Sequence, residues 1–321
     1  DLRYGANTFI TEAEVSLGQL PEFQTVARWG NNDIYTLNNR YTAEQIFTLN
    51  PTTLVQTPVT NAWDYIYGPF VGTMGVGNNA PQVGRTGGRP NFLDNGNIVV
   101  MADDKSCILS TDNEVITFAI IQPNGAIVKG PTLVSTDDIF DNMCAVKGGF
   151  VIRAHNALLF YNNSGTLTFS NTVNESSGLT FSDAGGRGDN LRINGDIRSY
   201  YVYAAGALSP GNAQAGVAAW DTRTGQWVAS SIVSDGDPAM QKVDRCGLAV
   251  DALNRVCVAY VYQPDTTWPQ QVAARVAQFD GSQFVWQTHS FYPFVNHDEN
   301  PANVLGYKTT NPYVAMNTRQ I

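Results

Sequence analysis

The sequence predicts an all-β fold built from repeated four-stranded antiparallel sheets. A strand–turn–strand unit recurs along the chain, and a second unit of the same kind follows most copies. No long segment shows the apolar periodicity of a helix. The two units together recur about every 50–60 residues, the length of one blade of a β-propeller. We therefore predict a single β-propeller with about six blades.

The first unit is an inner hairpin, in which two strands are joined by a tight polar turn. Turns such as Asn95-Gly96 and Gly148-Gly149 supply the positive φ angles that short hairpin turns need. The copies of this inner hairpin lie at 27–35, 92–99, 145–151, 193–197, 248–256 and 304–314.

The second unit is an outer hairpin, which has an apolar residue on each side of a polar turn that usually contains glycine. Pairing of an outer hairpin with the preceding inner hairpin gives a four-stranded sheet. The copies of the outer hairpin lie at 47–54, 121–127, 160–167, 220–227 and 279–284.

The predicted blades make one domain of residues 1–321. Blades with both hairpins lie at about 23–59, 88–134, 143–174, 184–234 and 245–291. The last blade, 299–321, shows only the inner hairpin, and we predict that the N-terminal segment 7–17 supplies a strand to it. Such closure removes an exposed sheet edge. A seven-bladed ring that lacks part of its sequence and a two-sheet sandwich are the alternatives.

The segment 60–87 fits no blade and reads as an insertion. It holds several aromatic residues, including Trp63, Tyr65 and Tyr67, followed by a glycine-rich run. A loop of this length in a compact domain is usually functional or disordered. Its aromatic residues favour an ordered surface that binds a partner.

The charge of the chain excludes some partners. Lys and Arg number 19 against 28 Asp and Glu, so the net charge is −9. A duplex nucleic-acid binder needs clustered basic residues, and an anionic membrane attracts them, so neither partner is expected. No stretch reaches the roughly 18–20 apolar residues of a membrane span, so no membrane insertion is predicted.

The composition indicates where the protein works. Lys is rare, whereas Asn, Thr, Gly and Ser are plentiful, which is typical of secreted, surface-exposed and virion proteins. The chain starts at Asp1 without an initiator Met or a signal-peptide pattern. We therefore expect an extracellular or virion-surface protein that is a processed chain or part of a larger chain or assembly.

The predicted binding site lies on one face of the propeller. Loops that precede the innermost strands and loops that follow their partner strands open on the same face, where polar side chains can converge on a ligand. The predicted ligand-binding residues, including those of the insertion, are Arg89, Asp141, Asp189, Arg192, Asp244, Arg245, Trp63, Tyr65, Tyr67 and Trp268. The alternative is that these are solvated loop charges, with Arg–Asp pairs between neighbouring blades.

The same face carries the candidate catalytic residues, which are His155 and the run His297, Asp298 and Glu299. A nucleophilic triad is not indicated, because no G-x-S-x-G motif occurs and the chain has only three histidines. Paired carboxylates could hydrolyse a glycosidic bond. A histidine base beside an arginine that neutralises a uronate could instead cleave it by elimination.

No cofactor is predicted, although two acidic groupings suit a structural Ca²⁺ ion. One is Asp235 with Asp237, and the other is Asp137-Asp138 with Asp141. Ca²⁺ prefers oxygen ligands, but neither grouping completes an EF-hand loop. Acidic turns of this kind are also common without a metal.

The four cysteines form no metal-binding pattern. Cys107 and Cys144 are predicted at the same face of adjacent blades, and Cys246 and Cys257 near cross-strand positions of one hairpin. Two interpretations of these cysteines remain, which are two disulfides or buried free thiols. The tripeptide Arg187-Gly188-Asp189 reads as a flexible loop rather than as an integrin-attachment motif.

The blade pattern resembles the broad group of secreted propellers that includes the sialidases. Arg89-Pro90, just before an inner strand, is similar to the arginine that opens the sialidase ring. The chain contains no S-x-D-x-G-x-T-W Asp box, and Trp220-Asp221 lies outside a WD40-like pattern. The resemblance therefore implies the architecture over most of the chain and no catalytic residue.

These observations lead to a functional prediction. We expect a binding or structural module that recognises a glycan or protein partner through one propeller face. The alternative is a polysaccharide-degrading hydrolase or lyase with its active site in the central funnel.

Overall fold

The computed structural model describes part of the chain. The described residues are 25–28, 34–38, 45–49, 56–60, 91–104, 115–122, 126–135, 143–154, 156–182, 191–211, 214–234, 242–263 and 271–292. The chain divides into two compact units, which are Asp1–Phe92 with Gly96–Asp137, and Leu93–Asn95 with Asp138–Ile321. Within the described ranges no helix is long and apolar enough to cross a membrane.

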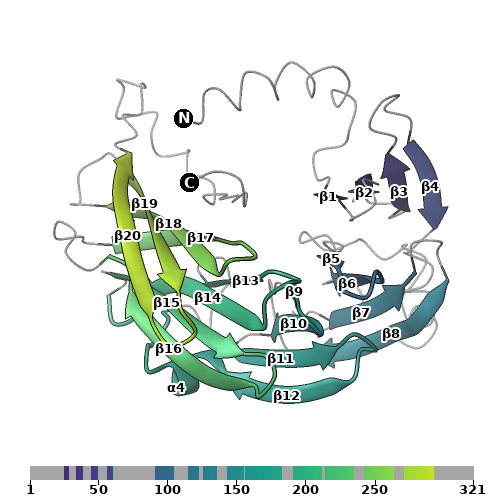
Figure 1. Ribbon diagram of the computed structural model, residues 1–321, viewed down its shortest axis with the longest axis horizontal. Helices are drawn as coiled ribbons and strands as arrows, with labels where there is room; N and C mark the ends of the chain where they lie inside the picture. The colour runs from purple at the N-terminus through teal and green to yellow at the C-terminus, as the bar shows by residue number, and fades with distance from the viewer. Residues whose placement is uncertain are drawn as a thin grey trace. The chain divides into compact units, whose positions relative to one another are not determined.

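The first unit contains two four-stranded sheets in which each strand pairs antiparallel with the next one in the chain (Figure 1). The strands of the first sheet are β1 (Thr25–Arg28), β2 (Ile34–Asn38), β3 (Gln45–Leu49) and β4 (Gln56–Thr60). Those of the second sheet are β5 (Asn91–Phe92), β6 (Ile98–Asp104), β7 (Val115–Ile121) and β8 (Ile127–Ser135).

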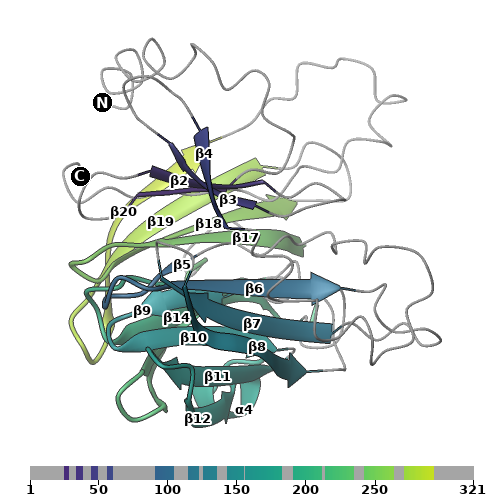
Figure 2. The ribbon, with the colours of Figure 1, turned by 90° about the vertical axis from the view of Figure 1, so that its right-hand side faces the viewer.

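The second unit contains three such sheets and one short helix. The first sheet consists of β9 (Met143–Val146), β10 (Gly149–Ala154), β11 (Ala157–Asn162) and β12 (Leu167–Thr172), and the helix α4 (Val173–Ser177) follows it. The second consists of β13 (Leu191–Gly195), β14 (Tyr201–Leu208), β15 (Gln214–Asp221) and β16 (Gln226–Ile232). The third consists of β17 (Lys242–Val250), β18 (Arg255–Gln263), β19 (Gln271–Phe279) and β20 (Phe284–Tyr292), side by side in Figure 2.

These sheets confirm the predicted all-β class and its four-stranded antiparallel blades, the building unit of a β-propeller. The predicted number of blades and the closure by 7–17 stay predictions, because residues 1–24 and 293–321 lie outside the described residues. The insertion also lies outside them, apart from Thr60 at the end of β4.

Each sheet of the second unit has two distinct ends. At the turn end, tight turns join the first strand to the second and the third strand to the fourth. One of these turns contains Gly225, whose φ of 68° favours glycine over any residue with a Cβ. At the opposite end, which we call the loop end, the innermost strands β9, β13 and β17 begin.

Buried apolar side chains fill both boundaries between neighbouring sheets of the second unit. The boundary between the β9–β12 and β13–β16 sheets contains Val146, Phe160, Leu191, Ile193, Val202 and Trp220. The boundary between the β13–β16 and β17–β20 sheets contains Tyr203, Val217, Val243, Leu248, Val258 and Phe279. Burial of apolar surface contributes roughly 25 cal/mol per Å², so these boundaries hold the sheets together.

Side-chain hydrogen bonds join neighbouring sheets of the second unit. The side-chain amide of Asn171 donates to the carbonyl of Gly225 at 2.9 Å, across 54 residues. The amide of Asn194 donates to the carbonyl of Leu248 at the same distance and the same separation. Asn194 and Leu248 both lie on innermost strands, so their separation of 54 residues approximates the length of one blade.

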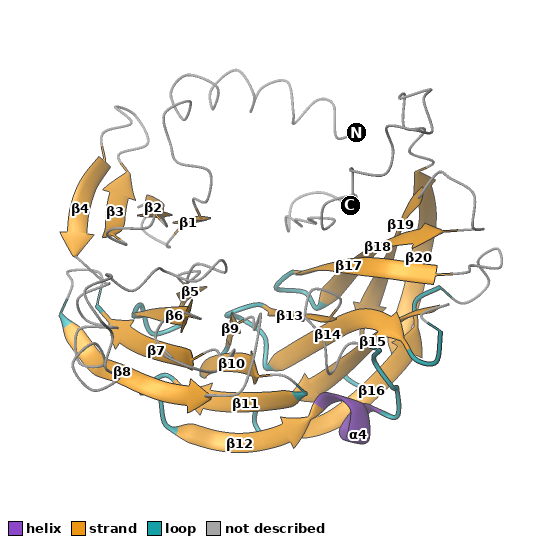
Figure 3. Ribbon diagram, turned by 180° about the vertical axis from the view of Figure 1, so that it is seen from behind, coloured by secondary structure: helices purple, strands orange, loops and turns teal. Residues whose placement is uncertain are grey.

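The helix α4 lies beside the outer strands β12 and β16 (Figure 3). It begins after Thr172 and ends at Gly178, whose φ of 67° places it in the left-handed region. Ser176 in this helix accepts a hydrogen bond from the indole Nε1 of Trp220 at 2.9 Å. The helix thus closes the outer side of the boundary between the two sheets.

The three described cysteines are buried free thiols. Cys246 lies opposite Tyr260, and Cys257 lies opposite Ala249, so the prediction that Cys246 and Cys257 are near cross-strand partners is wrong. Burial raises the pKa of Cys246 to about 12 and that of Cys257 to about 11. Cys144 is free as well and therefore forms no bridge to Cys107, which lies outside the described residues.

Candidate functional site

Most of the sequence-predicted site residues lie outside the described part of the chain and stay predictions. This group consists of Trp63, Tyr65, Tyr67, Arg89, Asp141, His155, Asp189, Asp235, Asp237, Trp268, His297, Asp298 and Glu299. The groupings at 137–141 and the tripeptide at 187–189 lie outside it too. Within the described ranges, no group of three or more His, Cys, Asp or Glu residues could hold a metal ion.

Three predicted site residues fall on described strands at the loop end. Arg192 lies near the start of β13, whereas Asp244 and Arg245 lie near the start of β17, and these two innermost strands contact each other. Burial raises the pKa of the Cys246 thiol, and the nearby guanidinium of Arg192 lowers it. The structure therefore brings Arg192 next to the strand that carries Asp244 and Arg245.

A further charged residue at the loop end is Arg153, which was absent from the sequence prediction. It lies one residue before the end of β10 and is buried. An arginine inside the apolar run from Phe150 to Ala154 is the signal that could have identified it, because a charge is costly to bury without partners.

The turn end carries a second candidate surface, at the boundary between the β9–β12 and β13–β16 sheets. Tyr200 lies in the turn before β14, where two cations approach its ring. Nζ of Lys147 is 4.8 Å from the ring centroid, and Cζ of Arg223 is 5.0 Å from it. Cations at these distances are attracted to the ring by its quadrupole.

Arg223, in the turn between β15 and β16, also forms an ion pair with Asp221, the last residue of β15. Its Nη2 lies 2.6 Å from Oδ2 of the carboxylate. Burial pushes the pKa of Asp221 upward, but hydrogen bonds from the side chain and the N–H of Arg223 outweigh burial and lower it. The carboxylate therefore stays ionised and holds the guanidinium beside Tyr200.

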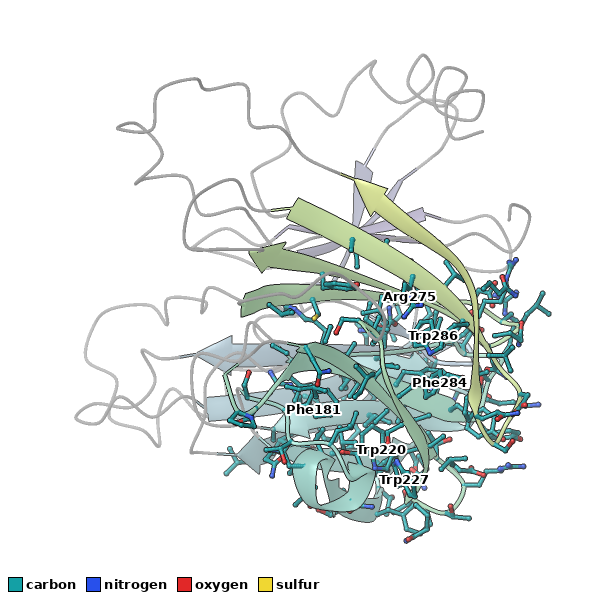
Figure 4. The ribbon with its side chains drawn as sticks, turned by 90° about the vertical axis from the view of Figure 1, so that its left-hand side faces the viewer. Phe181, Trp220, Trp227, Arg275, Phe284 and Trp286 are labelled. Atoms are coloured by element: carbon teal, nitrogen blue, oxygen red, sulfur yellow. The ribbon has the colours of Figure 1, made fainter. Side chains whose placement is uncertain are left out.

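Two exposed aromatic side chains continue this surface outward. Trp227 on β16 is 42% exposed, and Phe169 on β12 is 37% exposed. Trp227 is the cross-strand partner of the buried Trp220 and lies beside it (Figure 4), so it faces the β9–β12 sheet. Phe169 is the partner of buried Phe160 and faces the β13–β16 sheet.

The close approach of Phe169 to Gly225 joins these parts into one surface. A Cβ added at Gly225 would lie 2.5 Å from Cβ of Phe169, so only glycine leaves room for the ring. We call this surface the aromatic ledge and define it by Lys147, Phe169, Tyr200, Arg223 and Trp227.

The ledge combines aromatic faces with hydrogen-bonding groups. The hydrogen-bonding groups are the ammonium of Lys147 and the guanidinium of Arg223, which both lie over the ring of Tyr200. Rings of this kind can stack on the C–H faces of a ligand, while Lys147 and Arg223 can donate hydrogen bonds to it.

The neighbouring turn between β19 and β20 contains a carboxylate whose titration can be measured directly. Oγ and N–H of Ser282 each donate to Asp280 at 2.8 Å, and N–H of Gln283 donates at 2.9 Å. These hydrogen bonds, that of the Ser282 hydroxyl first, lower the pKa of Asp280 from 3.8 to about 2.

We expect Ser282→Ala to raise the pKa of Asp280 toward its ordinary value, in a carboxyl NMR titration. Because folding lowers this pKa, the stabilisation is present above the ordinary carboxyl pKa and is lost as pH falls toward about 2. Thr224→Ala in the β15–β16 turn is the matched control and should leave Asp280 unchanged. An identical midpoint in Ser282→Ala and the unmodified chain would contradict this explanation.

No protein-family profile and no curated protein matches the chain. Among solved structures it is similar to TolB from Acinetobacter baumannii, with 12% identity, a TM-score of 0.42 and coverage of 84% of this chain and 57% of TolB. It is also similar to the Pan2 WD40 domain of Neurospora crassa, with 9% identity, a TM-score of 0.44 and coverage of 84% and 65%. The chain thus spans less than two thirds of either protein.

A third similar structure is an exo-1,5-α-L-arabinanase from a bovine ruminal metagenomic library. The identity is 11%, the TM-score is 0.40, and coverage is 83% of this chain and 96% of the arabinanase. These solved structures are β-propellers, and the described sheets of this chain have the form of propeller blades.

Proposed function

We propose that the chain is a carbohydrate-recognition module that binds a glycan at the aromatic ledge. The observation that carries this proposal is the exposure of Trp227, which is 42% exposed beside Phe169 of the neighbouring sheet, which is 37% exposed. Tryptophan is usually highly buried, so an exposed indole in a well-packed sheet indicates a contact surface.

The charge of the ledge narrows the class of glycan. Arg223 is neutralised by Asp221, and Lys147 is the remaining formal charge among the residues that define the ledge. Strong attraction to a polyanion needs several clustered cations. The ledge is therefore suited to a neutral or weakly acidic saccharide, which stacks on the rings and accepts hydrogen bonds from the cations.

The location of the protein is part of this proposal. Glycan recognition fits an extracellular or virion-surface protein with few lysines and many Asn, Thr, Gly and Ser residues. The experiment compares glycan binding at the ledge with two other outcomes. One is a protein partner, and the other is binding at the loop end through Arg192 and its predicted neighbours.

Trp227→Ala is expected to weaken glycan binding by about 2 kcal/mol, roughly a 30-fold higher Kd. A glycan array finds the ligand, and calorimetry on the best hit measures the Kd. Leu253→Ala is the matched control, since Leu253 is an exposed apolar side chain in the β17–β18 turn, and it should bind like the unmodified chain.

Two results would overturn this proposal. Equal affinity of Trp227→Ala and the control would place binding elsewhere, and no hit on the array would remove the glycan as the partner. Release of reducing sugar or unsaturated uronate, lost in His297→Ala or Asp298→Ala, would favour the hydrolase or lyase instead.

A further inference from the structure

Two asparagines of the second unit lie in the sequence pattern of an N-glycan acceptor, which is Asn-x-Ser or Asn-x-Thr without proline at x. They are Asn162, with Ser164 two residues later, and Asn174, with Ser176 two residues later. The first lies at the end of β11, where the turn to β12 begins, and the second lies in α4. N-linked glycans are bulky and lie on the surface, so an acceptor needs an amide nitrogen that opens to solvent.

The side chain of Asn174 is held inside the fold by both of its polar atoms. Its Nδ2 donates to the carbonyl of Phe181 at 3.3 Å, and its Oδ1 accepts the N–H of the same residue at 2.9 Å. Phe181 is buried, and the hydroxyl of Ser176 is bonded to Thr172 and Trp220. A sugar bonded to Nδ2 would lie between α4 and this buried residue, so a glycan at Asn174 would disrupt the contact.

The side chain of Asn162 has the opposite arrangement, because its oxygen alone holds the turn. Oδ1 accepts the N–H groups of Ser164 and Thr166, each at 3.0 Å, and the hydroxyl of Ser164 at 2.7 Å. This directs Nδ2, on the other side of the amide carbon, away from the three donors, and none of the described residues accepts a hydrogen bond from it. Ser164, Thr166 and the first four residues of β12 are exposed, so the turn is open to solvent.

The residue that begins the outer turn is an aspartate in the two following sheets. Oδ1 of Asp221 accepts the N–H of Arg223 at 2.9 Å, and Oδ1 of Asp280 accepts that of Ser282 at 2.8 Å. A carboxylate oxygen is therefore sufficient to hold a turn of this kind. Asn162 supplies the same kind of oxygen and adds a nitrogen that turn formation does not require.

The hairpin that carries Asn162 lacks the charges of the neighbouring hairpins. Residues 156–174 contain no Lys, Arg, Asp or Glu, and Leu167 beside the turn is 49% exposed. The outer hairpins of the two following sheets contain Asp221 with Arg223, and Arg275 with Asp280. An N-linked glycan is a bulky solubilising group. A glycan at Asn162 would therefore give this hairpin the hydration that charged residues give the others.

We propose that Asn162 is an N-glycan acceptor site and that Asn174 is not. Acceptance of a glycan rests on the proposed extracellular location and not on glycan binding at the aromatic ledge. In the transfer, the C1–O bond of a lipid diphosphate-linked oligosaccharide breaks and a C1–Nδ2 bond forms. Nδ2 loses one proton, and the lipid diphosphate leaves. The hydrogen bonds to Oδ1 persist in the product, because the glycan replaces a hydrogen on the other atom.

Secretion of the full chain from a cultured eukaryotic cell tests the proposal by mass spectrometry. Treatment with peptide-N-glycosidase in heavy-oxygen water leaves a labelled aspartate wherever a glycan was attached. We expect the label at Asn162 and not at Asn174. Asn162→Asp should abolish the glycan and keep the turn, as Asp221 and Asp280 do in their turns. Ser164→Ala should also abolish the glycan, although Nδ2 remains.

Thr166→Asp is the matched control, because it adds the same charge to the same exposed turn and leaves Asn162 and Ser164 in place. It should be glycosylated like the unmodified chain, and circular dichroism and the Tm show that each secreted chain is folded. An unlabelled Asn162, a labelled Asn174 or no folded unmodified chain in the medium would overturn the proposal, whatever the glycan array shows. So would a glycan that persists in Asn162→Asp or Ser164→Ala, or one that is lost in Thr166→Asp.

Discussion

Asp251→Asn is expected to lower the free energy of unfolding by about 3–5 kcal/mol. Asp251 and Arg255 form a buried ion pair in the β17–β18 turn, with side-chain exposures of 2% and 4%. Oδ2 lies 2.5 Å from Nε of the guanidinium, and Oδ1 accepts the N–H groups of Leu253 and Arg255. Asparagine keeps an acceptor for the turn but removes the charge that neutralises the buried guanidinium.

The measurement is urea denaturation at neutral pH, and the matched control is Asp221→Asn. Asp221 makes the same kind of pair with Arg223, whose side chain is largely exposed. Exposed pairs contribute about 0–1 kcal/mol, so this control should change the midpoint little. Equal losses for Asp251→Asn and Asp221→Asn would show that burial of the pair has no special effect.

Trp220→Ala is expected to cost about 3–5 kcal/mol of unfolding free energy, because it removes a large side chain from a packed boundary. Trp220 is fully buried between the β9–β12 and β13–β16 sheets. Its indole also donates to Oγ of Ser176, which ties α4 to the sheet. The substitution therefore leaves both a cavity and a hydroxyl that has lost its donor.

Trp227→Ala is the matched control for stability, since Trp227 lies directly opposite on the next strand but is exposed. The same denaturation should show a change of less than about 1 kcal/mol for it. Trp220→Phe should fall between the two, because it keeps most of the volume and loses the hydrogen bond. A loss for Trp220→Ala no larger than that of Trp227→Ala would contradict the packing described for this boundary.

The sheets could be predicted from the sequence because the turn chemistry is local. The pairs Asn95-Gly96 and Gly148-Gly149 mark inner turns whatever residues surround them. Gly96 and Gly148 have positive φ angles, as expected for such turns. The alternation of apolar residues then places a strand on each side of a turn. Local chemistry of this kind needs no knowledge of neighbouring blades.

The aromatic ledge could not be predicted because it depends on strand register. The pairing of β15 with β16 is irregular between Ala219 and Trp220, and the extra residue turns Trp227 toward the same face as Trp220. A one-residue change of this kind moves a side chain to the opposite face. The sequence shows Trp227 as a member of an outer hairpin but not which face it takes.

Register also explains the error over the cysteines. Cys246 lies four residues before the end of β17, whereas Cys257 lies two residues after the start of β18, so the two cysteines are not opposite each other. If the alternation of side chains is counted from the wrong turn residue, every cross-strand pair is shifted. Cys246 pairs with Tyr260, and Cys257 pairs with Ala249.

The side-chain amides of Asn171 and Asn194 each bind a backbone carbonyl of the next sheet. If one sheet separates from its neighbour, a backbone carbonyl loses its hydrogen-bond donor. A buried hydrogen-bonding group without a partner costs free energy. Each sheet is thus coupled to its nearest neighbour, as in a linear array of repeats. Opening of the β13–β16 sheet would break both of these hydrogen bonds, whereas opening of either neighbouring sheet would break one of them.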